Sequence, residues 1–244
     1  MTRDASSRPL PPKWASDSLS DHLDAAFGNI LATFVEKRQQ YEILESIDHC
    51  FSGINEGFSE AQDSLAPLFF TRSHSAFRTE CQLAMSGQSA ESFCIGRSCL
   101  EFALYALQIS KNPDYEEVWL QRHKDEESLQ RVRRTFSNTS VLGTLAEIDR
   151  DLHATIKTLY ERTIDFGGHP NERSVTSNMS MTRVGEVIVV RQLSLHGDSP
   201  ALEHALKTAA QIGLGALYVF GAIFPDKFDN PDLVATMNQL RAHL

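Results

Sequence analysis

Apolar residues recur at three- and four-residue steps over most of the chain, which is the pattern of amphipathic α-helices. The first run extends from Asp17 to Ser52-Gly53, as one long helix or two short ones. Later runs end at Gly, Asn or Ser residues or begin at X-Pro pairs that favour helix starts. We expect further helices over about 59–84, 89–110, 114–124, 144–161, 199–224 and 231–244.

The segment 89–110 is apolar around most of its circumference, so we expect this helix at the centre of a bundle. Its polar residues Arg97, Glu101, Tyr105 and Gln108 follow at steps of four, four and three, which places them in one stripe. The stripe is either a buried ion pair with satisfied neighbours or one wall of a polar pocket. Both interpretations require partners from another helix, because burying charges is costly.

The periodicity changes between Ser174 and His196. Val187, Val189, Leu193 and Leu195 alternate with other residues, and Gly185-Glu186 is suited to a tight turn. We therefore predict an all-α fold, a helical bundle with one inserted β-hairpin at about 174–196. Since two strands alone are marginally stable, we expect the hairpin to lie on the helical body.

Residues 1–16 combine Ser, Pro and charge without apolar periodicity, which predicts a flexible tail that Trp14 anchors, followed by a single helical domain over 17–244. The 23 Lys and Arg against 32 Asp and Glu give a formal charge of −9, so any RNA contact would be a local patch. The four cysteines form no CxxC pair and favour buried, reduced thiols in a cytoplasmic protein. The apolar run 209–224 is about 16 residues, too short to span a bilayer comfortably, so no membrane partner is expected.

The stretch from Leu159 to Met179 contains the residues best suited to chemistry. Arg162 ends a predicted helix, and His169 follows the pair Gly167-Gly168, whose positive φ would return the imidazole toward the guanidinium. An Arg and a His in one pocket suit phosphodiester cleavage, because Arg stabilises phosphate charge and His moves a proton near neutral pH. That chemistry needs no metal or other cofactor.

At Arg162, six intervening residues and His169, the sequence resembles the HEPN superfamily, helical bundles that include metal-independent RNases of bacterial defence and toxin systems. The resemblance extends over about 59–224. Arg97 and Glu101 look like the Arg-x-x-x-Glu helix of some of its bacterial families, and His169-Pro170 follows a Tyr160 helix as in those families. It implies that Arg162 stabilises the phosphate, that His169 is the general acid/base, and that the pair lies at a homodimer interface.

Further candidate contacts for an RNA or nucleotide substrate are Arg97, Glu101, Tyr105, Asn171 and Arg173. The competing interpretation is a non-catalytic scaffold or a small-ligand or nucleotide-binding module, dimeric through an apolar helix. Arg162 would then pair with Asp165 or Glu101, and His169 would cap a helix end. A metal site on Asp165, His169 and Glu172 is a further alternative, and Arg191 with His196 is a second pair of suitable spacing.

Overall fold

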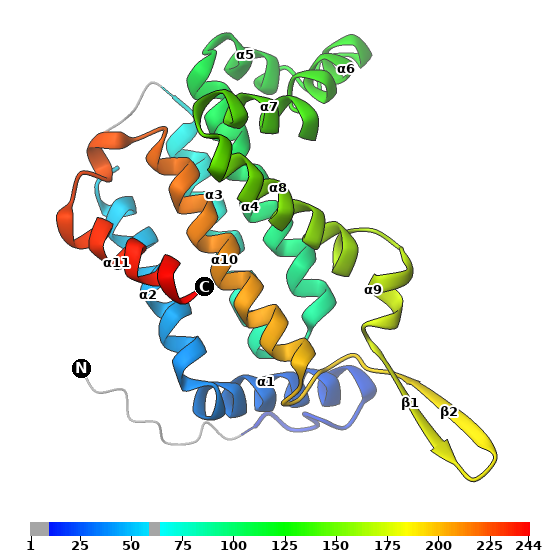
Figure 1. Ribbon diagram of the computed structural model, residues 1–244. Helices are drawn as coiled ribbons and strands as arrows, with labels where there is room; N and C mark the ends of the chain where they lie inside the picture. The colour runs from blue at the N-terminus through cyan, green and yellow to red at the C-terminus, as the bar shows by residue number, and fades with distance from the viewer. Residues whose placement is uncertain (1–9, 59–63) are drawn as a thin grey trace.

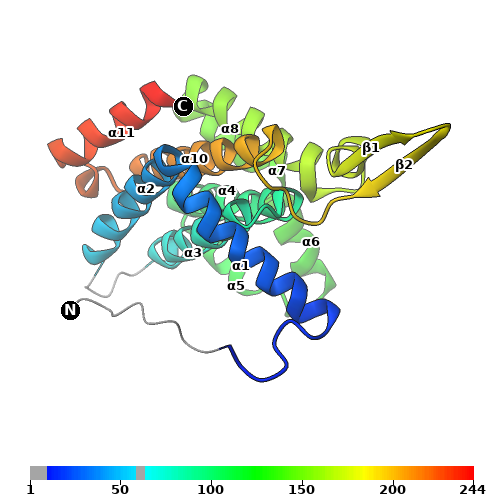
Figure 2. The same ribbon diagram turned by 90° about the horizontal axis from the view of Figure 1, so that it is seen from below.

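The computed structural model describes residues 10–58 and 64–244, which form a helical bundle with one two-stranded hairpin (Figures 1 and 2). The all-α prediction is therefore confirmed. In chain order the elements are α1 (Ser18–Glu36), α2 (Arg38–Glu56), α3 (Ala66–Met85), α4 (Ser89–Lys111), α5 (Asp114–Leu120), α6 (Glu126–Thr135), α7 (Asn138–Ile148), α8 (Arg150–Thr163), the π-helical turn η1 (Ile164–Gly168), α9 (Glu172–Thr176), β1 (Met179–Val184), β2 (Val187–Gln192), α10 (Pro200–Gly221), the 3-10 turn η2 (Pro225–Lys227) and α11 (Pro231–His243).

The core lies where α3, α4 and α10 pack together, with α2 and α8 on either side (Figure 1). The prediction that 89–110 is a central helix is confirmed by α4, in which Cys99, Ala103 and Leu107 are fully buried. Close approach of α10 depends on Gly213, because a Cβ there would lie 2.5 Å from Phe77 Cε2. Small residues at this crossing let the helix backbones approach closely enough to exclude water.

Side-chain caps start many of the helices and explain where predicted helices divide. Asp17, Asp125, Ser137, Ser199 and Asn230 each accept a backbone N–H at the first turn of the following helix. The predicted single helix 144–161 was wrong. Its extended residue Asp149 ends α7 and caps α8 by accepting from the amides of Asp151 and Leu152.

The start of the second predicted helix differs from the sequence pattern. The helix expected from Ser59 has its first residues, 59–63, outside the described residues, and α3 begins at Ala66 with Pro67 in its first turn. At the chain start, residues 1–9 of the predicted tail also lie outside the described residues. Trp14 Nε1 donates to Asp24 Oδ1 at 2.7 Å, the expected anchoring contact.

The hairpin forms as predicted, but its position was predicted wrongly. β1 pairs antiparallel with β2 across the two-residue turn Gly185-Glu186, in which Gly185 has φ +63°. The strands project away from the bundle (Figures 1 and 2), and Met181 on β1 is 69% exposed and Ile188 on β2 is 64% exposed. Helix α9 and its flanking loop occupy 172–178, so the strands begin later than expected.

The cysteines agree in part with the prediction of buried, reduced thiols. All four are free thiols; Cys50 and Cys99 are buried and Cys81 is partly buried, but Cys94 is exposed, contrary to expectation. Burial raises the pKa of the Cys81 thiol, which makes it unreactive near neutral pH. Within 10–58 and 64–244, no helix has the length and apolar character needed to cross a membrane.

Candidate functional site

Arg162 and His169 contact different neighbours. The Arg162 guanidinium donates from Nη1 to Gln211 Oε1 at 2.6 Å and to Thr208 Oγ1 at 3.2 Å, both on α10. His169 Nε2 instead lies 3.2 Å from Arg97 Nη1 on α4. The two motif residues, which the sequence analysis expected in one pocket, therefore have different hydrogen-bond partners, and within the described part of the chain Arg162 pairs with neither Asp165 nor Glu101.

Helix geometry explains this divergence. Side chains two positions apart on an α-helix point roughly 200° away from each other. Tyr160 faces α4, where its hydroxyl donates to Glu101 Oε1 at 2.8 Å. Arg162 on the same helix must then face away from α4, toward α10.

The first glycine before His169 acts differently from the prediction. Gly167 lies in the π-helical turn η1 and does not share the positive φ of Gly87 and Gly185. Gly167 is required for another reason, because a Cβ there would lie 2.1 Å from the Ala90 carbonyl oxygen of α4. The turn thus lies directly against α4, which brings His169 to Arg97.

Arg97, Glu101, Tyr160 and His169 form one polar group, which we call the Arg97 cluster. Arg97 Nε donates to Glu101 Oε1 at 2.9 Å, and the guanidinium carbon lies 4.9 Å from the centroid of the Tyr160 ring. The side chains of Arg97 and Glu101 are 27% and 33% exposed, so solvent and ligands reach them. Of the two interpretations of the α4 stripe, the ion pair with satisfied neighbours describes this half, although the pair is only partly buried.

The contacts fix the protonation pattern of the cluster. Arg cannot accept a hydrogen bond, so His169 Nε2 must accept from Arg97 and carries no proton in this arrangement. Burial lowers the pKa of Arg97, but the bond and charge of Glu101 outweigh that effect and the net shift is upward. Burial and the Glu101 charge raise the pKa of the Tyr160 hydroxyl, which remains protonated and donates to Glu101.

The other predicted substrate contacts have local partners. Tyr105 packs on Phe136, with ring centroids 4.9 Å apart, and Gln108 donates to the Thr135 carbonyl, so the second half of the α4 stripe is structural. Asn171 caps α9 in a capping box, and Arg173 donates to Asp165 Oδ2 at 2.7 Å on the surface. Asn171 therefore caps the helix at this point, whereas the non-catalytic interpretation of the sequence assigned a helix cap to His169.

Two further alternatives from the sequence, the Arg191–His196 pair and a metal site, are not supported by where their residues lie. His196 is buried and lies 2.8 Å from Asn178 Oδ1, whereas Arg191 is exposed on β2. Over the described ranges, no three His, Cys, Asp or Glu side chains are grouped closely enough to hold a metal ion, and Asp165 is engaged by Arg173.

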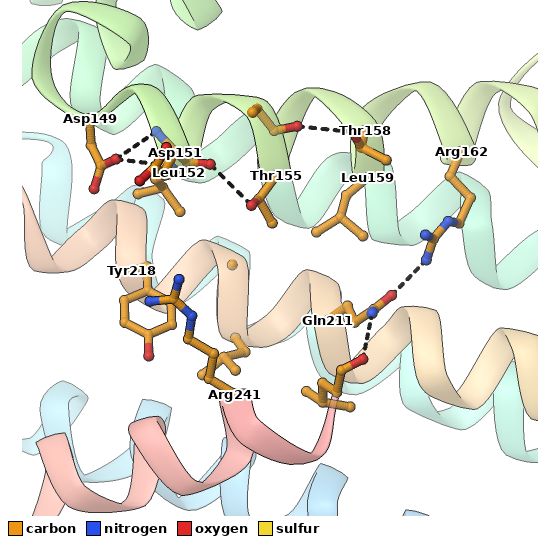
Figure 3. A pocket seen from close by; sticks show the side chains of 14 residues that line it. Asp149, Asp151, Leu152, Thr155, Thr158, Leu159, Arg162, Gln211, Tyr218 and Arg241 are labelled. Atoms are coloured by element: carbon orange, nitrogen blue, oxygen red, sulfur yellow. Dashed lines mark hydrogen bonds between the residues drawn. The ribbon is translucent and has the colours of Figure 1, made fainter.

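A cavity of about 600 Å³ lies between α8, α10 and α11, on the side of α8 to which Arg162 points (Figure 3). Arg162 and Gln211 lie at one end; Asp149, Tyr218 and Arg241 lie at the other. Between them the wall combines Leu152, Leu159 and Leu214 with Thr155 and Thr158. We call this space the α8–α10 cavity.

Comparisons with protein-family models, with curated proteins and with solved structures found no match to this chain.

Sequence reasoning did not include Tyr160, Thr208 or Gln211 among the site residues. Tyr160 could have been found from the helical spacing to Arg162, which requires the two to face opposite helices. Gln211 stands out as a polar residue within the apolar run 209–224, although its partner is visible only in three dimensions.

Proposed function

We propose that this protein is a HEPN-like, metal-independent ribonuclease whose Arg and His pair is Arg97 and His169. The observation that carries the proposal is the 3.2 Å approach of Arg97 Nη1 to His169 Nε2 in a cluster open to solvent. A guanidinium and an unprotonated imidazole nitrogen at this separation can both reach one phosphodiester group. The proposal keeps His169 in the role that the resemblance implies and gives the phosphate role to Arg97 in place of Arg162.

The chemistry follows from the donors and acceptors of the cluster. A phosphate oxygen that enters beside Arg97 takes over the Nη1 donor, which frees His169 Nε2 to accept the proton of the RNA 2′-hydroxyl. The 2′-oxygen then attacks phosphorus, the bond from phosphorus to the 5′-oxygen breaks, and the leaving oxygen takes a proton from water. The products are a 2′,3′-cyclic phosphate and a free 5′-hydroxyl, and Arg97 stabilises the charge that grows on the phosphate.

Glu101 and Tyr160 are positioning residues in this scheme. Glu101 accepts from both Arg97 and Tyr160 through the same oxygen, Oε1, and so holds the guanidinium in front of His169. An i,i+4 ion pair of this exposure stabilises a fold by only about 0.3–0.5 kcal/mol. Their principal contribution is thus orientation of Arg97.

The test is cleavage of a labelled single-stranded RNA, with the cyclic phosphate end as the product scored. His169→Ala and Arg97→Ala should each lower the rate by about 100-fold or more, since each removes a group that acts in the transition state. The matched controls are His49→Ala, an exposed histidine on α2, and Arg38→Ala, whose i,i+4 pair with Glu42 at 3.0 Å copies the Arg97–Glu101 geometry. Both controls should cleave at the wild-type rate, with and without EDTA.

Two outcomes contradict the proposal. One is the absence of cleavage by the wild-type protein over a panel of RNA sequences. The other is cleavage that Arg97→Ala leaves intact while Arg162→Met abolishes it, which would return the phosphate role to the sequence motif.

We also propose that the protein is a homodimer through α1. Five large apolar side chains form an exposed row along this helix at constant four-residue spacing: Leu19, Leu23, Phe27, Leu31 and Val35. The row is symmetric about Phe27, so an antiparallel second copy places Phe27 on Phe27 and Leu23 on Leu31. Such a two-fold pairing is self-complementary, as a dimer interface requires.

The basic residues that follow α1 are engaged within the subunit, since Lys37 pairs with Asp198 and Glu203 and Arg38 pairs with Glu42. The proposed pairing therefore rests on the apolar row. Rows at four-residue spacing pack into each other at a crossing angle of about 50°.

A further inference from the structure

Arg162 is a half-buried cation for which the described residues provide no acidic partner. Its Nη1 partners, Thr208 and Gln211, are both neutral. Burial is the cause that lowers the pKa of this guanidinium, and no nearby carboxylate offsets it. A charge held in this way costs free energy that a bound anion would recover.

The surroundings of Arg162 are built to hold this charge in one place. Gln211 accepts from Arg162 through Oε1 and donates through Nε2 to the Leu244 carbonyl at 3.1 Å, so it ties the guanidinium to α10 and to the segment after α11. Both hydrogen-bonding ends of the Gln211 amide are thus engaged. Arg162 is fixed at the end of the α8–α10 cavity, and its side chain reaches from α8 toward Gln211 (Figure 3).

The shape of the cavity restricts the ligand. It follows α8 from Asp149 to Arg162, and the 1.5 Å rise per residue makes this span roughly 20 Å. The wall beyond Arg162 combines the apolar side chains of Leu152, Leu159 and Leu214 with the hydroxyl-bearing side chains of Thr155 and Thr158. A cavity of this length fits an elongated molecule, and its leucine side chains suit the apolar part of such a ligand.

The far end of the cavity does not compete for the head group. Asp149 accepts from two amides at the start of α8, and the Arg241 guanidinium lies over the Tyr218 ring, 5.9 Å from its centroid. Asp149 and Asp151 line the cavity near this end, so an anionic head group bound there would lie near two carboxylates, whereas Arg162 hydrogen-bonds the neutral groups of Thr208 and Gln211. An anionic head is therefore bound most favourably at the Arg162 end.

We propose that the α8–α10 cavity binds an elongated organic anion, with its acidic head group on Arg162 and its apolar chain along Leu159, Leu214 and Leu152. This site is separate from the Arg97 cluster, because Tyr160 and Arg162 project from opposite faces of α8. The ligand class is that of medium-chain carboxylates and alkyl phosphate esters, which share a compact anionic head and a flexible apolar body.

The test is titration of the full chain with decanoate and with decyl phosphate by isothermal calorimetry, with 1-decanol as the uncharged probe. Arg162→Met removes the charge and keeps the side-chain volume. It should weaken binding of the anions by about tenfold or more, the loss expected for a charge-assisted hydrogen bond. Arg150→Met is the matched control, because Arg150 is exposed on the same helix and does not line the cavity.

A second variant tests the chain-binding part. Thr158→Phe puts an aromatic ring into the wall beside Arg162 without changing the charge, and it should also weaken decanoate binding. Circular dichroism of each variant shows whether the fold is kept. Decanoate and decyl phosphate distinguish a carboxylate head from a phosphate head.

Three results would overturn the inference. The first is absence of binding by any of the three probes to the wild-type protein. The second is binding of 1-decanol as tight as that of decanoate and unchanged in Arg162→Met, which would make the cavity an apolar site without head-group recognition. The third is equal loss in Arg150→Met and Arg162→Met, which would indicate a general charge effect.

Discussion

Two regions of the molecule are rich in apolar residues but differ in how far these residues are buried. One is the crossing of α3, α4 and α10, and the other consists of the two outer elements, helix α1 and the hairpin. In the first region apolar side chains are enclosed, and glycines at the helix crossings let backbones approach. In the second region Leu19, Phe27 and Ile188 lie in solvent, and α1 is attached to the bundle partly by polar bonds from Asn29 and Thr33 to carbonyls near the end of α3. Apolar periodicity thus predicts the element in both regions but not the side that faces the core. Apolar surface left outside in this way is typical of an interaction surface.

The largest change in stability is expected from substitution of Gly213, the glycine at the core crossing. Gly213→Ala places a Cβ 2.5 Å from the buried Phe77 ring, and overpacking of this kind lowers the free energy of unfolding by about 1–3 kcal/mol. Gly143→Ala is the matched helical control, since nothing lies within 4 Å of its Cβ position, and it should raise that free energy by about 0.5–1 kcal/mol. Urea unfolding measures both, and equal stability of the two variants would refute the close crossing.

The next largest effect is the pH dependence of stability that Glu80, a buried acid of the same core, should cause. Glu80 is enclosed, its Oε2 has no hydrogen-bond partner, and burial raises its pKa well above 4.5. The unfolded chain releases this proton from about pH 4.5 upward while the folded chain keeps it, so folding loses stability as pH rises through that window.

Glu80→Gln is neutral at every pH and should remove this loss, so it should be more stable than the wild type at pH 8 and similar at pH 4.5. Unfolding curves at both pH values, with the exposed Glu42→Gln as control, measure the difference. An unchanged pH dependence in Glu80→Gln would show that Glu80 ionises normally in the folded protein.

The smallest effect on folding and the clearest effect on assembly are expected at α1. Phe27→Glu changes an exposed residue, so the free energy of unfolding of the subunit should shift by no more than about 0.5 kcal/mol. At the two-fold axis, however, it puts two negative charges in contact. Analytical ultracentrifugation should therefore find a dimer for the wild type and a monomer for Phe27→Glu.

Lys13→Glu, an exposed charge change before α1, is the control and should remain dimeric. A monomeric wild-type protein at micromolar concentration would rule out the α1 pairing. A dimer that Phe27→Glu leaves intact would move the interface elsewhere, with the exposed hairpin as the next surface to test.

Much of the fold was accessible from the sequence because it depends on local rules. Helix starts at Asp17, Ser199 and Asn230 follow from short side chains that accept backbone amides, and the hairpin turn follows from Gly185. The division at Asp149 was missed because apolar spacing continues across it, although an Asp followed by a helical run is itself a cap signal. The position of the hairpin was missed because alternation of apolar residues shows two faces and does not show whether either is covered.

The sequence by itself determined the helical class, the boundaries of helices such as α4, α10 and α11, the hairpin and the polar stripe on α4, since each depends on residues within a few positions of one another. Only the tertiary structure decided that His169 meets Arg97 and that Arg162 faces α10. The reason is rotation about the α8 axis, which packing against α4 sets and which no spacing between Arg162 and His169 can encode. The same rotation separates an exposed Arg and His cluster on one face of α8 from a cavity with an uncompensated arginine on the other.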